Sequence, residues 1–391
     1  MRTLLIGRGL RAFVDGCVAV LLPAYLLALG FGTWEVGLLS TVTLLGSAVA
    51  TMAVGAWGHR FAQRRLLLAA ALLMAATGLA FAGMSAFWPL LVVAFVGTLN
   101  PSSGDVSVFL PLEHARLAAA AQGGARTALF ARYSLTGALC AAFGALAAGA
   151  PDALAGIGVD RLVAMRCVFV LYGLTGLAVW ALYLRLPASP AHEAAAAPAP
   201  LGPSRRVVWR LAGLFSVDAF AGGLVVNALL ALWLFERFDL SLAAAGTYFF
   251  WAGLLSAASQ LAAPRVAQRF GLLNTMVYTH IPSSVFLILA AFAPNLPAAL
   301  GLLLLRAALS QMDVPTRSAF VMAVVTPAER SAAASFTAVP RSLAAAASPA
   351  LGGALLAAGW LAVPLVACGL LKIAYDLALL AAFRHRVDDT G

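Results

Sequence analysis

The segment from Leu186 to Arg206 reads LPASPAHEAAAAPAPLGPSRR. It is rich in proline, alanine, glycine and serine and has no apolar periodicity, so it has little surface to bury and is predicted to be an exposed, flexible linker. On both sides of it the sequence consists of long hydrophobic runs. We therefore divide the chain into an N-terminal domain (residues 1–186), a linker (187–206) and a C-terminal domain (207–391).

The composition indicates a membrane protein. Of the 391 residues, 63% are apolar and only 10% are charged, whereas a soluble domain carries roughly a quarter charged residues. Apolar runs of ~18 residues or more recur along the chain, which is the length that a helix needs to cross a hydrocarbon core about 30 Å thick. We therefore expect an all-α polytopic membrane protein.

Twelve apolar segments are long enough for such helices. They are residues 12–31, 35–58, 66–86, 88–110, 126–149 and 162–185 before the linker, and 207–235, 242–263, 272–293, 296–325, 332–358 and 361–383 after it. The sequence thus predicts two six-helix bundles joined by a linker.

The charges of the predicted loops indicate an orientation. One side carries Arg60, Arg64, Arg65, Arg116, Arg205, Arg206, Arg265, Arg269, Arg330, Arg384 and Arg386. The other side carries Glu35, Asp152, Asp160, Glu236 and Asp239 against Arg161 and Arg237. Because basic loops face the cytoplasm, we expect both termini and the linker there, in the inner or plasma membrane of a bacterial cell. The net charge of +10 reflects this bias and gives no reason to expect nucleic acid as a partner.

The two halves share a pattern of residues. The matching positions are Val14-Asp15 with Val217-Asp218, Gly37 with Gly246, Arg60-Phe61 with Arg269-Phe270, Pro89 with Pro297, Asp105-Val106 with Asp313-Val314, and Arg126 with Arg330. All offsets lie between 203 and 209 residues, which chance would rarely give. The pattern indicates that six spans have been duplicated in parallel, giving two pseudo-symmetric bundles.

This organisation resembles the major facilitator superfamily of secondary transporters over essentially the whole chain. The loop after the second span, GAWGHRFAQRR, is similar to the family motif G-x-x-x-D-R-x-G-R-R through Gly55, Arg60, Arg64 and Arg65. His59 stands where the family has Asp, and Ala62 where it has Gly. In the family that Asp helps to latch the cytoplasmic side of the outward-open state, so the resemblance implies a weaker or pH-sensitive latch here.

A second family signature is displaced. The antiport motif of the fifth span, which ends G-P-x-x-G-G, is absent between Arg132 and Gly149, and the similar string SPALGG occurs at Ser348–Gly353 in the eleventh span. The subgroup is therefore not resolved by the residues. The resemblance implies alternating access, in which two bundles rock around a site near mid-membrane.

Charged residues inside the spans are the candidate site, because each is costly to place in a bilayer. Asp15 and Asp218 lie in equivalent spans, as do Asp105 and Asp313, and Arg306 lies close to the midplane, ~13 Å deep at about 1.5 Å per residue. Arg132 and Arg341 are expected at shallower depths. Asp218 has no basic residue within a helical turn, so we expect it to be the carboxylate that binds a proton.

Structural interpretations compete with these. Asp313 and Arg317 are four residues apart and are predicted to pair on one helix face, as are Lys372 and Asp376, which we leave out of the site. Asp105 follows the helix-weakening run Asn100–Gly104, and it either braces a bend or forms a gate with Arg132 or Arg126.

Asp15 lies one turn after Arg11 and is equally consistent with an inner gate. His280 is predicted to be a packing residue. The five histidines lack metal-ligand spacing, and the four cysteines, Cys17, Cys140, Cys167 and Cys368, form no C-x-x-C pair. We therefore expect no metal and no cofactor.

The sequence favours a transporter over an enzyme or a sensor. No catalytic constellation is evident, no nucleotide-binding G-x-x-x-x-G-K-[ST] string occurs, and the longest soluble segment is the linker. We expect a monomer that exports an amphipathic or drug-like compound in exchange for protons, with a small-molecule substrate, protons and the lipid bilayer as its partners. The alternatives are proton-coupled uptake or exchange of a small metabolite or organic anion and, more remotely, a membrane-embedded enzyme or sensor.

Overall fold

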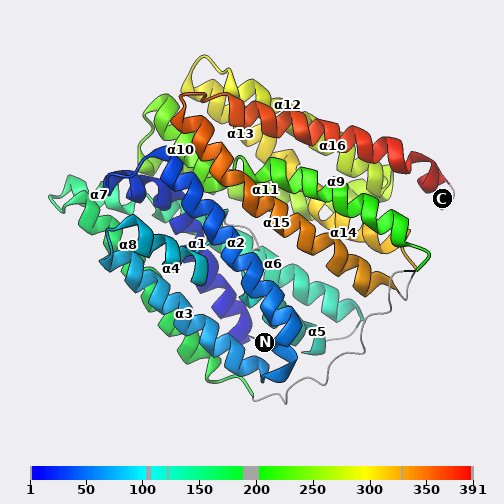
Figure 1. Cartoon of the computed structure of the whole chain (residues 1–391), viewed down its shortest axis with the longest axis horizontal. Helices are drawn as coiled ribbons and strands as arrows, with labels where there is room; N and C mark the ends of the chain where they lie inside the picture. The colour runs from blue at the N-terminus through cyan, green and yellow to red at the C-terminus, as the bar shows by residue number, and fades with distance from the viewer. Residues whose placement is uncertain (1, 103–106, 121–122, 188–201, 327–328, 389–391) are drawn as a thin grey trace. The chain divides into compact units, whose positions relative to one another are not determined.

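The computed structural model describes residues 2–102, 107–120, 123–187, 202–326 and 329–388. All of the regular elements in these ranges are helices (Figure 1). Before the linker they are α1 (Arg2–Ala28), α2 (Thr33–Trp57), the 3-10 helix η1 (Gly58–Arg60), α3 (Gln63–Gly83), α4 (Phe87–Val96), α5 (Phe109–Ala120), α6 (Gly123–Ala147), α7 (Ala150–Gly156) and α8 (Arg161–Tyr183). After it come α9 (Arg205–Gly223), α10 (Asn227–Phe238), α11 (Leu242–Phe270), α12 (Leu272–Ala291), α13 (Leu296–Ser310), α14 (Asp313–Val324), α15 (Arg330–Ala357) and α16 (Val363–Asp388).

The helices confirm the all-α membrane class. Within the described ranges, ten helical segments are long and apolar enough to cross a membrane. They correspond to all of the predicted spans except the fourth and the eleventh. The eleventh is the helix α15, which is continuous but not among the ten. Three predicted spans are interrupted. The seventh is divided between α9 and α10, the tenth between α13 and α14, and the fourth between α4 and α5.

The predicted fourth span, residues 88–110, is not one helix. α4 ends at Val96, residues 98–100 are not helical, and the next helix among the described residues begins at Phe109. Gly97 is extended at the end of α4, and Asn100 Oδ1 accepts hydrogen bonds from the backbone N–H of Ser102 at 3.0 Å and from its hydroxyl at 2.7 Å. This local turn competes with the helical hydrogen bonds, and Pro101 supplies no N–H to extend them. The expectation of a continuous helix is therefore wrong here.

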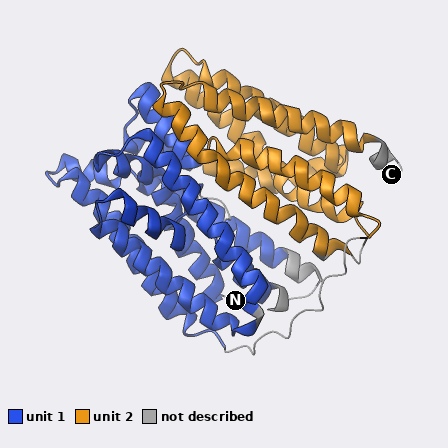
Figure 2. Ribbon diagram, viewed as in Figure 1, with its two compact units in different colours: residues 1–195, 226–250 blue, residues 196–225, 251–391 orange. Residues whose placement is uncertain are grey.

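The helices pack into two compact units (Figure 2). Unit 1 comprises residues 1–195 and 226–250, and unit 2 comprises residues 196–225 and 251–391. Residues 226–250, which contain α10, therefore pack with the N-terminal helices, although they follow the linker in sequence. The division of the duplicated halves at residues 187–206 stays a prediction.

The same pairs of spans pack in both units. In unit 1, α1 packs along α6 and α3 along α8; in unit 2, α9 packs along α15 and α12 along α16. These are the first span with the fifth and the third with the sixth, followed by their equivalents in the second half. A parallel duplication would produce this arrangement.

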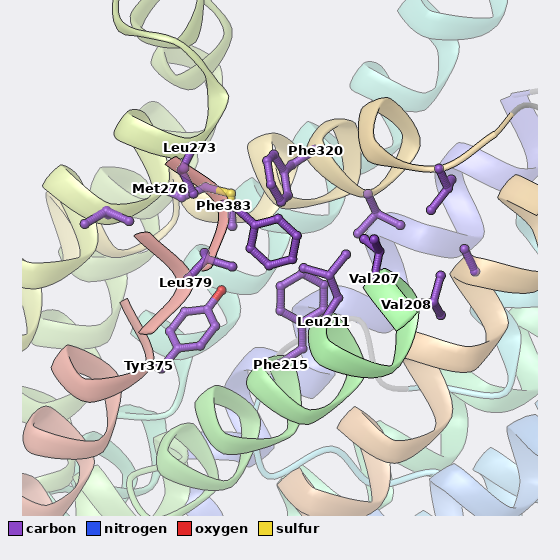
Figure 3. Packing of buried hydrophobic residues seen from close by; sticks show 14 residues of the cluster. Val207, Val208, Leu211, Phe215, Leu273, Met276, Phe320, Tyr375, Leu379 and Phe383 are labelled. Atoms are coloured by element: carbon purple, nitrogen blue, oxygen red, sulfur yellow. The ribbon is translucent and has the colours of Figure 1, made fainter. Parts of the chain in front are cut away.

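An apolar core stabilises unit 2 (Figure 3). Phe215 of α9 packs edge-on against Tyr375 of α16, with ring centroids 6.3 Å apart, and Phe320 of α14 packs against Phe383 of α16 at 5.5 Å. Leu211 and Leu379 are fully buried in the same cluster. The core fixes the relative positions of α9, α14 and α16, the three helices that carry most of the charged residues described next.

Candidate functional site

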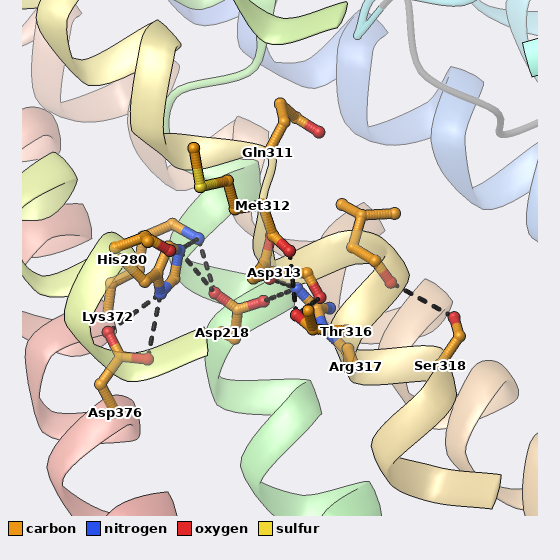
Figure 4. Close-up of polar contacts among 12 residues, drawn as sticks. Asp218, His280, Gln311, Met312, Asp313, Thr316, Arg317, Ser318, Lys372 and Asp376 are labelled. Atoms are coloured by element: carbon orange, nitrogen blue, oxygen red, sulfur yellow. Dashed lines mark hydrogen bonds and ion pairs between the residues drawn. The ribbon is translucent and has the colours of Figure 1, made fainter. Parts of the chain in front are cut away.

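Six titratable side chains meet inside unit 2 (Figure 4). They are Asp218 of α9, His280 of α12, Asp313 and Arg317 of α14, and Lys372 and Asp376 of α16. We call them the unit 2 polar cluster. Five of the six are classed as buried, and the side chain of Lys372 is only 13% exposed. Because isolated charges are costly in such surroundings, their partners decide whether the cluster is stable.

Asp218 is at the centre of this cluster. Its Oδ1 accepts a hydrogen bond from Lys372 Nζ at 2.6 Å, and its Oδ2 lies 3.2 Å from Arg317 Nη2. The sequence predicts an acid without a basic neighbour, and on its own helix that is true. Tertiary packing nevertheless supplies two cations from α16 and α14, so the expectation of an unpaired Asp218 is wrong.

Arg317 joins two acids. Its Nη2 donates to Oδ2 of Asp313, four residues earlier, as well as approaching Asp218. The helical pairing predicted for Asp313 and Arg317 is therefore present, but it is part of a larger ion network. The guanidinium of Arg317 also lies 5.4 Å from the centre of the Phe215 ring, at the edge of the apolar core.

Lys372 and Asp376 do not simply pair with each other. Lys372 Nζ is directed to Asp218 and lies 3.4 Å from His280 Nε2, while His280 Nδ1 lies 2.9 and 3.1 Å from the two carboxylate oxygens of Asp376. The sequence interpretation omitted Lys372 and Asp376 from the site and treated His280 as packing. A signal was present, since all three lie well inside predicted spans, but only packing shows that they meet.

The other predicted charges of this half are less closely connected. Arg306 lies within electrostatic range of His280, and Arg341 within range of Arg317 and Asp218. Arg306 is half-buried, whereas Arg341 is exposed. They border the unit 2 polar cluster without forming an ion pair with it in the described residues.

Unit 1 contains a second polar cluster that the sequence interpretation missed. Glu113 of α5 is fully buried, and its oxygens lie 2.6 and 2.5 Å from Arg11 Nη2 of α1. Tyr133 of α6 and Tyr183 of α8 both donate hydroxyl hydrogen bonds to the same carboxylate. Glu113 thus ties four helices together. Its position three residues before Arg116, an acid among the basic residues of this side of the chain, was the available signal.

Asp15 lies next to this cluster. It is within electrostatic range of Arg11 and Arg8 and within hydrogen-bonding range of Tyr172 of α8. The guanidinium of Arg11 also packs 3.9 Å from the centre of the Phe109 ring. The structure therefore places Asp15 beside basic residues of its own helix, as the sequence predicts.

Three further candidates give less information. Arg132 is exposed on α6. Asp105 lies outside the described residues, so its predicted role as a brace or gate is not tested, and the same is true of the side chain of Arg126. Among the described residues, no group of His, Cys, Asp or Glu has the arrangement of a metal site.

The cytoplasmic loop motif lies where α2 meets α3. Gly55 is in the last turns of α2, and His59 and Arg60 belong to η1. Arg64, in the first turn of α3, donates from Nη2 to the backbone oxygen of Leu184 at 2.6 Å, which anchors the loop to the end of α8. Arg65 follows on the same helix, and the side chain of His59 lies outside the described set. The latch role of this motif stays a prediction.

The helical architecture and its buried charges define a multi-pass membrane protein with ion networks inside its helix bundles. The model of the Major Facilitator Superfamily matches residues 4–305. The chain belongs to this family, so it is a secondary transporter of small molecules and not an enzyme.

Known relatives support the family without fixing a substrate. An uncharacterized membrane protein of Saccharomyces cerevisiae is 26% identical over 96% of this chain and 92% of its own length. A D-xylose transporter of Levilactobacillus brevis is 29% identical over 29% of this chain and 24% of its own length.

Solved structures show the same fold. The nucleoside transporter NupG has a TM-score of 0.73 at 16% identity, with 97% of this chain and 98% of that chain covered. A D-xylose-proton symporter has a TM-score of 0.74 at 15% identity, with 96% of both chains covered. At these identities the likeness concerns the fold alone.

Proposed function

We propose that this transporter couples the movement of its substrate to protons and that the unit 2 polar cluster is the coupling site. The observation that carries the proposal is the continuous set of contacts from Asp376 through His280 and Lys372 to Asp218. Such a network joins α9, α12 and α16 through titratable groups. A proton that enters it changes the partners of several charges at once, and it can therefore bias one conformation of the protein over another.

We further propose export of an amphipathic or drug-like compound across the inner or plasma membrane by a monomer whose termini and linker are cytoplasmic. The basic loops support the orientation. The sparse polar side chains of the predicted spans, with few asparagines, support an amphipathic substrate over a sugar. The carried compound then needs few hydrogen bonds from the protein.

A small organic anion, taken up or exchanged, is the second candidate. It is favoured by one observation, the position of two arginines, Arg306 and Arg341, at the border of the unit 2 polar cluster. Guanidinium groups recognise carboxylates and phosphates through paired hydrogen bonds. A bound anion would then supply the counter-charge for these two arginines.

Reconstitution in proteoliposomes tests the coupling. A survival screen of a transporter-deficient host across toxic compounds first identifies a substrate, and flux of that compound is then measured with and without a pH gradient. We expect accumulation that a protonophore abolishes. Equal accumulation of the compound with and without the pH gradient would exclude proton coupling.

Two substitutions test the roles of the acids. Asp218→Asn removes the charge that holds Lys372, so we expect loss of proton-driven accumulation while substrate exchange persists. Asp15→Asn, beside Arg11 and Arg8, should impair both activities, as loss of a gate would. Unimpaired accumulation by Asp218→Asn would show that Asp218 is not needed for coupling.

A further inference from the structure

The contacts of His280 determine which of its ring nitrogens carries the hydrogen. Lys372 has three N–H donors and no acceptor, and its Nζ faces His280 Nε2 at 3.4 Å. Nε2 must therefore offer its lone pair, and the hydrogen is on Nδ1. From there it is donated to the carboxylate of Asp376, 2.9 Å away. The chain of donors runs from Lys372 to His280 to Asp376.

Asp218 and Asp376, the two acids at the ends of this series of contacts, differ in their partners. Asp218 faces two cations, Lys372 and Arg317. Asp376 has an exposed fraction of 0%, and within the described residues the ion pair recorded for it is with His280. A proton on Asp218 would leave two cations without their anion. A proton added to Asp376 and His280 removes an uncompensated charge instead.

We propose that the pair formed by His280 and Asp376 is the proton-binding site of this transporter, and that Lys372 transmits its occupancy to Asp218. The proposal rests on the proton coupling proposed above. It assigns the binding step to two residues of α12 and α16 and gives Asp218 the role of a responding group.

The proton balance leads to the same result for either location of the added proton. If it binds Nε2, His280 becomes an imidazolium whose N–H points at Lys372. If it binds Asp376, the new O–H donates to Nδ1, and the one hydrogen of the neutral ring moves to Nε2. In both cases Nε2 changes from acceptor to donor and opposes the ammonium of Lys372. That contact is then lost.

Asp218 can accept the displaced interaction. His280 Nε2 lies 3.8 Å from Asp218 Oδ1, the same oxygen that accepts from Lys372. After proton uptake the Nε2–H can replace Lys372 as the partner of Asp218. Proton binding between α12 and α16 therefore weakens the polar contact between α16 and α9 that Lys372 and Asp218 form.

Other charges face the pair and set which protonated form is favoured. They are Asp218 from α9, Arg306 from α13, Arg317 from α14 and Lys372 from α16, with the ring of Tyr375 packed 6.2 Å from that of His280. Three of these groups are cations. They oppose a further positive charge on the ring, so we expect the neutral pair with the proton on Asp376.

Proton binding can be measured without a substrate, with the proton itself as the probe. Infrared difference spectra of the full-length protein in lipid nanodiscs, recorded as the pH is lowered, report the carbonyl stretch of a newly protonated carboxyl group. We expect this band in the wild type, its absence in Asp376→Asn, and an altered midpoint in His280→Gln. The exposed neighbour Tyr278 provides the control Tyr278→Phe, which should reproduce the wild-type spectrum.

A variant that leaves the pair intact gives a second test if Asp376→Asn does not fold. Lys372→Gln removes a cation close to His280, so the midpoint of the band should move to higher pH by about one unit or more. A band that persists in Asp376→Asn, disappears in Asp218→Asn, or is absent from the wild type would overturn the assignment.

These outcomes separate the site from the function. If the band is lost in Asp376→Asn but a pH gradient drives no transport by the wild type, the proton site stands and proton coupling fails. If the gradient drives transport and the band is unchanged in Asp376→Asn, coupling stands and the site lies elsewhere.

Discussion

Lys372 Nζ of α16 lies 2.6 Å from Asp218 Oδ1 of α9. The contact joins two helices that are far apart in sequence, and both side chains are largely withdrawn from solvent. Such a pair is costly to form and also costly to break, because removal of one partner leaves the other charge buried without compensation.

The first prediction concerns this pair. Lys372→Gln and Asp218→Asn should each lower the free energy of unfolding by about 3 kcal/mol. The double variant should lose less free energy of unfolding than the sum of the two single losses, because neither charge of this pair then remains without its partner. Thermal unfolding in detergent measures the coupling, with the exposed Arg265→Gln as a control. Strictly additive losses would show that the two charges do not interact.

The second prediction concerns Glu113. Glu113→Gln should destabilise unit 1 by about 3 kcal/mol, because Arg11 then loses its buried counter-ion. Tyr183→Phe removes only one hydrogen bond to the same carboxylate and should cost about 2 kcal/mol. Unfolding midpoints of the two variants give the comparison. Equal stability of Glu113→Gln and wild type would contradict the role of Glu113 as the tie between helices.

The third prediction concerns the crossing of α1 and α6. A Cβ added at Gly144 would lie 1.8 Å from the backbone oxygen of Phe13, which no rotation of a side chain can relieve. Gly144→Ala should therefore separate the two helices and cost about 1–3 kcal/mol or more. The matched control is Gly213→Ala, where the added Cβ meets no atom within 4 Å. The yield of monodisperse protein should fall for Gly144→Ala and stay at the wild-type level for Gly213→Ala.

The fourth prediction concerns pH and a loop outside the predicted spans. Glu329 accepts hydrogen bonds from Thr326 Oγ1 at 2.6 Å and from the backbone N–H groups of Gly202 and Ser204. Hydrogen bonds from the side chains of Ser204 and Thr326 are the main causes that lower the pKa of Glu329 from 4.5 to about 2.

A lowered pKa means that this group stabilises the folded protein above pH 4.5 and that the contribution is lost as the pH falls toward about 2. The Tm of Glu329→Gln should accordingly lie below that of the wild type at pH 6, and the difference should shrink on acidification. A difference that is constant with pH would show that the carboxylate charge is not responsible.

The sequence predicted the membrane class, the family and most of the spans, because the length and apolarity of a segment decide whether it can cross a bilayer. It also located Asp218, Asp313 and Arg317. The partners of Asp218 could not be predicted, since Lys372 is 154 residues away and only helix packing brings the two together.

Local competition explains why the fourth predicted span is interrupted. Hydropathy treats residues 88–110 as one apolar run, but Asn100 and Pro101 redirect the backbone in the middle of it. Glu113 was missed for a related reason. It lies beyond the expected end of that span, and its burial depends on three helices that surround it in space.

The break between α13 and α14 has a mechanical consequence. α13 ends at Ser310 and α14 begins at Asp313, so the run of helical hydrogen bonds is interrupted shortly before Arg317, whose Nη2 lies 3.2 Å from Asp218 Oδ2. Bending a chain at such a point disrupts fewer of these bonds than bending an intact helix. A tilt of α14 would move Asp313 and Arg317 together and leave their own ion pair intact. The same movement would take the guanidinium of Arg317 away from Asp218.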